Sequence, residues 1–232
     1  LRSSVGSSSS DARNMWPYIT IPSRETEVAE TLFDAVRFAA EHGQSRLVTI
    51  HGRKFVGKTR LCNRVIDTGQ IQGLGYTVLS STRSSNDILT SFFSFREIVS
   101  TALRACDAAT QRSDESLASG VSAPEEDEDE DETDESIVRR LINRKILNKN
   151  DQLMIGRILP GVMNNQLLSL LKGRNPGALI KDIAASVFKI MIPLQPAMLV
   201  FEAQGNDCDI DLSSWNLMEE LLLSAGKHCP QM

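Results

Sequence analysis

The stretch Gly52-Arg53-Lys54-Phe55-Val56-Gly57-Lys58-Thr59 decides the predicted fold, because it matches the phosphate-binding pattern G-x-x-x-x-G-K-[ST] at every fixed position. The apolar residues 47–50 before it predict a short buried strand, and residues 59–66 after it predict the opening of a helix. Backbone N–H groups at the N-terminus of such a helix surround phosphate oxygens. The chain is therefore predicted to bind a nucleotide, and the alternative is a glycine-rich surface turn.

Each fixed residue of the pattern has a chemical task. Lys58 is the catalytic candidate in the loop because its ammonium reaches the β- and γ-phosphates, and Thr59 is the metal candidate because its hydroxyl supports Mg²⁺. Arg53 and Lys54 occupy variable positions, which usually point outward. The loop residues predicted to contact the nucleotide are Gly52, Arg53, Lys54, Phe55, Val56, Gly57, Lys58, Thr59 and Arg60.

Composition limits the class of protein. The 232 residues are 41% hydrophobic and 24% charged, which is ordinary for a soluble globular domain. The net charge is −5, and ten of the residues 125–135 are acidic. The rest of the chain therefore carries a net charge of +5, so the acidic character of the protein comes from this one segment. The four cysteines and three histidines lack metal-ligand or disulfide spacing. With no apolar run near 18 residues and no signal-like N-terminus, we expect no membrane span and a cytoplasmic or nuclear location.

The composition also changes along the chain. We expect residues 1–18 to be a disordered linker, because serine dominates their first half. Residues 19–106 and 137–232 are predicted to form one α/β domain. Between them, residues 107–136 are predicted to be a disordered acidic insertion, too charged to bury and too long for an ordinary loop. We interpret it as a solvated spacer, with binding to a basic partner as the alternative.

Helical and strand patterns alternate through the predicted domain. Helices are expected over residues 23–42, with Ser23 as the cap, over 88–105, over 137–171 with a break near Pro160, over 178–191, and after a cap at Ser213 or Ser214. Strands are expected at 76–79 and, as a fully apolar run, at 197–201. This order predicts the α/β class with a mostly parallel sheet whose faces the helices cover.

Several of these segments resemble the AAA-type ATPase domain of multidomain signalling ATPases, the origin-recognition-like or STAND group, and most closely the module of soluble adenylyl cyclases. The resemblance covers residues 19–105 and 195–223. Its motifs are an arginine-glutamate box at Ser23-Arg24-Glu25, the phosphate loop, a strand at Gly75-Tyr76-Thr77-Val78-Leu79, an aromatic-arginine helix at Phe93-Ser94-Phe95-Arg96-Glu97-Ile98, and an acidic strand at Leu199-Val200-Phe201-Glu202-Ala203-Gln204 followed by Ser213-Ser214-Trp215.

The resemblance implies a P-loop NTPase three-layer sandwich, incomplete at its C-terminus, that binds ATP with Mg²⁺. It implies a regulatory module of a larger signalling protein such as an adenylyl cyclase. By the same likeness Arg24 is expected near the adenine or ribose, and the alternative is a surface arginine in a first helical turn. The expected partners are therefore a nucleotide and the other domains of a parent protein.

The end of the acidic strand departs from that family. Two consecutive acids usually stand there, one supporting Mg²⁺ and one polarising the attacking water. This chain has Phe201-Glu202, so Glu202 is the second catalytic candidate, and its alignment to either role stays open. One acid is missing unless Asp207, Asp209 or Asp211 substitutes. The family's sensing residue and lid arginine do not appear either, so weak or absent hydrolysis is expected.

Two other functions remain open from the sequence. One is an active AAA ATPase that acts on DNA or on protein assemblies. The basic remainder of the chain permits nucleic-acid contact, but the lack of a concentrated Lys/Arg stripe argues against it. The other is a degenerate fold that serves only as an interaction scaffold.

Overall fold

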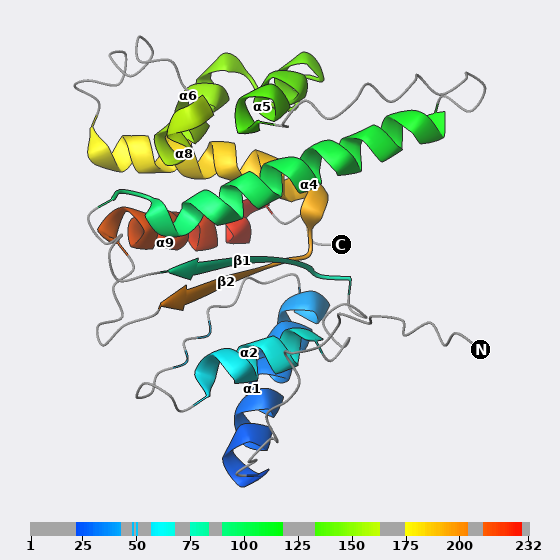
Figure 1. Ribbon diagram of the computed structural model, residues 1–232, viewed down its shortest axis with the longest axis vertical. Helices are drawn as coiled ribbons and strands as arrows, with labels where there is room; N and C mark the ends of the chain where they lie inside the picture. The colour runs from blue at the N-terminus through cyan, green and yellow to red at the C-terminus, as the bar shows by residue number, and fades with distance from the viewer. Residues whose placement is uncertain are drawn as a thin grey trace, which may run out of the picture.

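A two-stranded parallel sheet lies between helices that cover both of its faces (Figure 1). The fold is mixed α/β and mostly helical. The computed structural model describes residues 22–42, 48, 50, 57–67, 75–83, 90–117, 133–162, 175–203 and 211–228.

The two strands are β1, Thr77–Arg83, and β2, Ala197–Ala203, and they pair in parallel from Thr77↔Ala197 to Arg83↔Ala203. The strands predicted at residues 76–79 and 197–201 are thereby confirmed. Successive side chains of a strand point to opposite faces, so Phe201 of β2 packs in one cluster of buried residues and Met198 in another. The carboxyl ends of both strands meet at one edge of the sheet.

One face of the sheet is covered by α1, Pro22–His42, and α2, Lys58–Asp67. The buried Leu32 of α1 is the centre of the small cluster that includes Val78 and Met198 from the strands. The Tyr76 hydroxyl donates a hydrogen bond to the Val36 carbonyl at 3.1 Å, which fixes α1 against the start of β1. The predicted first helix is confirmed, but it begins at Pro22, which suits the first helical position and places Ser23 inside the helix.

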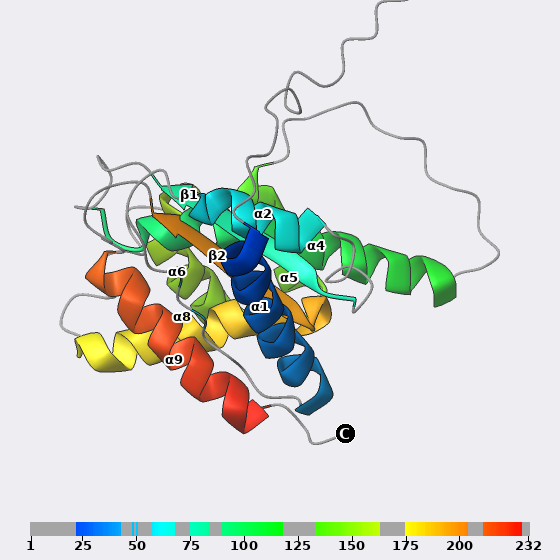
Figure 2. The ribbon, with the colours of Figure 1, turned by 90° about the horizontal axis from the view of Figure 1, so that it is seen from below.

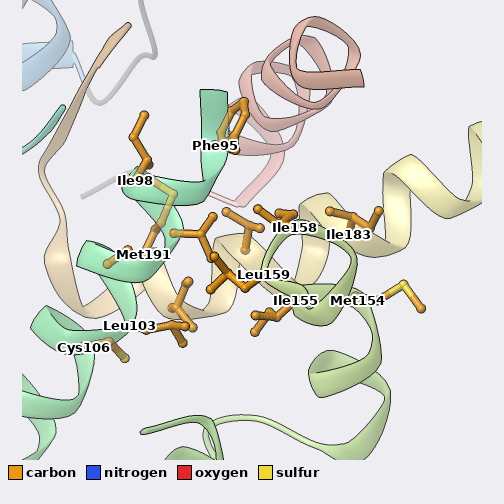
Figure 3. Packing of buried hydrophobic residues seen from close by; sticks show 14 of the residues in the cluster. Phe95, Ile98, Leu103, Cys106, Met154, Ile155, Ile158, Leu159, Ile183 and Met191 are labelled. Atoms are coloured by element: carbon orange, nitrogen blue, oxygen red, sulfur yellow. The ribbon is translucent and has the colours of Figure 1, made fainter. Parts of the chain in front are cut away.

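The larger hydrophobic core lies on the other face. Its helices are α4, Phe93–Leu117; α5, Asp134–Asn143; α6, Lys149–Ile158; α8, Pro176–Met191; and α9, Leu212–His228, with short 3₁₀ turns at Pro160–Val162 and Ile192–Leu194. Figure 3 shows apolar side chains of α4, α6 and α8 meeting in this core. The ring of Phe95 lies 4.9 Å from the ring of Phe201, so α4 packs directly on the sheet.

The helices expected to cover the sheet occupy different layers. In Figures 1 and 2, α8 and α9 lie side by side, and α5 and α6 pack beyond α4 and α8 rather than on the strands. The helices described within the predicted range 137–171, α5 and α6, therefore form an outer layer that packs on α4 and α8. They do not lie directly against the sheet.

Both ends of the predicted acidic insertion, residues 107–117 and 133–136, belong to helices or to a helix cap. The helix expected over residues 88–105 begins at Phe93 and continues to Leu117, and α5 already begins at Asp134. Asp107 explains the difference, because this residue is 3% exposed and accepts hydrogen bonds from Arg140 at 2.6 Å and Arg144 at 2.7 Å. A charge that looks solvated in the sequence thus ties α4 to α5, and residues 118–132 lie outside the described part.

The strand predicted at residues 47–50 falls mostly outside the described residues. Val48 and Ile50 are described and belong to no strand, and Ile50 packs against the Leu32 cluster. The linker at residues 1–18 is also outside the described part. No helix within the described ranges combines the length and apolar character needed to cross a membrane.

Replacement of Phe95 by alanine should destabilise the protein strongly. Phe95 is 0% exposed and joins α4 to β2, so its loss leaves a cavity worth about 3–5 kcal/mol of unfolding free energy. Denaturant unfolding of Phe95→Ala measures this loss. Ile192→Ala, at a side chain that is 55% exposed, is the matched control and should change stability by less than about 0.5 kcal/mol. Equal effects of the two changes would contradict the proposed core.

Candidate functional site

The candidate site lies where the start of α2 meets the carboxyl end of β2. The Thr59 hydroxyl donates a hydrogen bond to Glu202 Oε1, although the two residues are 143 positions apart in the sequence. Carboxyl edges of parallel sheets next to helix N-termini are the usual place for ligands in α/β proteins. The fold therefore brings together two of the residues that the sequence singled out separately.

The backbone at Gly57 allows α2 to begin at this point. Gly57 has φ of +87°, a left-handed conformation that residues with a Cβ rarely adopt, and its carbonyl accepts from the Leu61 N–H at 2.9 Å as the first helical hydrogen bond. A Cβ at Gly57 would meet no atom within 4 Å, so the need for glycine comes from the backbone conformation and not from crowding. Lys58 is the first residue of α2, and this first turn contains no acidic side chain.

Phe201 and Glu202 point to opposite faces of the sheet. The Phe201 ring packs in the core against Phe95, whereas Glu202 contacts Thr59 at the start of α2. Since consecutive residues of a strand alternate, only one of the pair can face the candidate site. Phe201 is therefore a core residue, and the single acid of β2 serves the site.

Cys62 is a half-buried neighbour of this pair that the sequence did not suggest. It follows Thr59 by three residues and therefore lies on the same side of α2. Burial raises the pKa of its thiol, and the negative charge of Glu202 raises the pKa further. No motif marks Cys62, because its interest comes only from its position relative to Glu202.

Asp211 is not available as a replacement acid. It is 6% exposed and serves as the cap of α9, accepting the Ser214 N–H at 2.8 Å and the Ser214 hydroxyl at 2.6 Å. The sequence suggested Ser213 or Ser214 for this cap, and the helix instead begins directly after Asp211. An aspartate three residues before Ser214 is itself a capping signal that could have identified it. Asp207 and Asp209 lie outside the described residues.

The remaining predicted site residues divide into two groups. Gly57, Lys58, Thr59 and Arg60 lie together at the start of α2. Arg24 lies in the first turn of α1, and its expected contact with adenine or ribose stays a prediction. The predicted loop residues that fall outside the described part are Gly52, Arg53, Lys54, Phe55 and Val56.

The donor set at the site suits a hard divalent cation. A hydroxyl and a carboxylate are oxygen ligands of the kind that Mg²⁺ prefers, and Mg²⁺ is commonly held by one or two carboxylates together with substrate phosphates and water. Within the described ranges, no group of three or more His, Cys, Asp or Glu side chains could hold a metal by itself. Thr59 and Glu202 thus fit a metal that arrives with a phosphate ligand.

Comparisons of the chain with protein-family models, with curated proteins and with solved structures found no match. The function is therefore inferred from the residues of the chain itself.

Removal of the Glu202 charge should make Cys62 more reactive. Glu202→Gln abolishes one of the two influences that raise the thiol pKa, so more thiolate is present at neutral pH and alkylation is faster. Peptide-resolved alkylation with iodoacetamide between pH 7 and 9 measures the change. Glu219→Gln, at an exposed position of α9, is the matched control and should leave the rate unchanged. Equal rates in wild type and Glu202→Gln would place Glu202 away from Cys62.

Proposed function

We propose that this chain is an ATP-binding P-loop NTPase domain of the AAA or STAND type, and a regulatory module of a larger signalling protein such as an adenylyl cyclase. The observation that carries the proposal is the contact between Thr59 and Glu202. In P-loop NTPases the hydroxyl of the loop and an acid at the end of a neighbouring strand together support the metal. A hydroxyl-carboxylate contact across 143 residues at this place is what that function requires.

The start of α2 supplies the positive end of the phosphate site. Its first N–H groups have no partner within the helix, and the helix dipole places partial positive charge there. Lys58 at the first helical position adds a full positive charge, and no acid in the first turn opposes it. Residues 52–56 complete the cradle by their fit to the phosphate-binding pattern.

Thr59 and Glu202 would hold Mg²⁺, which neutralises charge on the phosphates when it is bound. Their hydrogen bond keeps the Thr59 oxygen oriented toward the carboxyl end of β2. Thr59 is exposed and Glu202 is partly exposed, so both oxygens are accessible to a ligand. This arrangement favours the alignment in which Glu202 is the metal-supporting acid.

Hydrolysis is expected to be weak or absent, because a single acid would have to support Mg²⁺ and also polarise the attacking water. β2 contains only one carboxylate, and the position next to it is filled by Phe201 in the core. A Glu202 that is engaged with Thr59 does not at the same time orient an attacking water. The same observation favours the second candidate function, a degenerate scaffold that binds other domains without turnover.

Nucleotide binding should depend on Lys58. Lys58→Ala removes the charge that faces the phosphates, so affinity for a fluorescent ATP analogue should fall at least about tenfold, equivalent to one charged hydrogen bond. Fluorescence anisotropy with Mg²⁺ and with EDTA measures the affinity, and GTP serves as competitor. Lys181→Ala, at an exposed position of α8, controls for a general loss of positive charge. Unchanged binding in Lys58→Ala would remove the basis of the proposal.

Steady-state phosphate release should be close to background. The single acid at the site predicts turnover far below the common enzymatic range of about 1–1,000 s⁻¹. A coupled phosphate assay with Mg²⁺ and ATP tests this, with Glu202→Gln as the inactive reference. Turnover on the order of 1 s⁻¹ that is lost in Glu202→Gln would instead support the active ATPase.

A further inference from the structure

The buried carboxylate of Asp211 joins the two chain segments that leave the carboxyl ends of the strands. Strand β1 ends at Arg83, and the next described residues begin at Thr90, just before α4. Strand β2 ends at Ala203, and the next described residue is Asp211, just before α9. Asp211 lies at the end of the second segment and contacts the end of the first.

All the hydrogen bonds that Asp211 accepts from the described residues come from uncharged groups. Oδ1 accepts the Phe92 N–H at 2.9 Å and the Ser214 N–H at 2.8 Å, and Oδ2 accepts the hydroxyls of Ser214 at 2.6 Å and Ser94 at 3.5 Å. A carboxylate that is 6% exposed needs such partners, because burying an unpaired charge is costly. The N-terminal ends of α4 and α9 both face this carboxylate, so their dipoles stabilise its charge.

Phe92 depends on the same contact. It has φ of +58°, an unusual conformation for a residue with a large side chain, while its ring is 4% exposed in the core. Such strain persists only where the surroundings hold the backbone in place. The Phe92 ring and the bond from its N–H to Asp211 provide that hold, so the turn before α4 and the cap of α9 are fixed by one carboxylate.

These contacts reach the candidate site through the strands. Glu202 lies directly across from Thr82 in the parallel register, one residue before both strands end. Asp211 holds the start of α4 through Phe92 and Ser94, and the next residue, Phe95, packs its ring on Phe201, directly before Glu202. Loss of the Asp211 contacts would therefore loosen the packing of Phe95 on Phe201, which holds β2 in place next to Glu202.

We infer that Asp211 is a positioning residue for the pair formed by Thr59 and Glu202, and that it links nucleotide occupancy to the starts of α4 and α9. The inference rests on the proposed function for its nucleotide part. The packing route from Asp211 through Phe92, Ser94 and Phe95 to Phe201 involves no ligand.

Two variants separate positioning from simple helix capping. Asp211→Ser keeps a side chain able to cap α9 but is too short to hold Phe92 as well, and it removes the charge. Asp151→Asn is the matched control, because Asp151 is also buried, at 3% exposure, and also accepts hydrogen bonds at a helix start, from Asn148, Ser186 and Lys189. It lies in α6, which packs against α8 and α4.

Amide hydrogen exchange of the full chain without ligand tests the link. In Asp211→Ser, exchange should rise about tenfold at residues 58–61 and 200–203 as well as near Phe92, whereas Asp151→Asn should raise it only around α6 and α8. Exchange that rises only at residues 90–94 and 211–215 would overturn the inference. So would an unchanged exchange pattern, because Asp211 would then be no more than a cap.

Nucleotide titrations then separate the two proposals. The ratio of ATP-analogue affinity in Mg²⁺ to that in EDTA should fall about tenfold in Asp211→Ser and stay constant in Asp151→Asn. A constant ratio in Asp211→Ser would overturn the nucleotide part of the inference. If the wild type binds no ATP analogue, the proposed function fails, and the exchange pattern still decides whether Asp211 positions Glu202.

Discussion

The parallel pairing of β1 with β2 is the constraint on which the rest of the structure depends. Seven register pairs hold the strands together, and both strands end at the same edge of the sheet. The residues that follow β1 and those that follow β2, more than a hundred positions apart in the sequence, therefore start from neighbouring points at this edge. The contact between Thr59 and Glu202 and the contact between Phe92 and Asp211 both follow from this arrangement.

β2 serves the core and the candidate site at the same time. Its alternation directs Phe201 to Phe95 and Glu202 to Thr59, so a slip of one residue would bury the carboxylate and expose the ring. The apolar packing of Phe201 thereby specifies the register that the site needs. In a strand with a single acid, stability and function depend on the same pairing.

The buried carboxylates show two ways of holding helices together. Asp107 and Asp151 are each paired with basic side chains, Arg140 and Arg144 for the first and Lys189 for the second. Asp211 accepts only from backbone N–H groups and hydroxyls among the described residues. Ion pairs tolerate some movement of long side chains, whereas backbone donors fix the chain itself. Asp211 therefore holds the backbone itself in place at the starts of α4 and α9.

Local sequence patterns determined the secondary structure of much of the described chain. The apolar run at 197–201, the strand after Gly75 and the helix that opens at Lys58 were all predicted, because their periodicity and turn residues act within a few positions. Thr59 and Glu202 were each named as site residues. Their contact, the burial of Asp107 and the capping by Asp211 were decided by tertiary structure alone, because a charge in the sequence does not reveal which distant donors the fold will place around it.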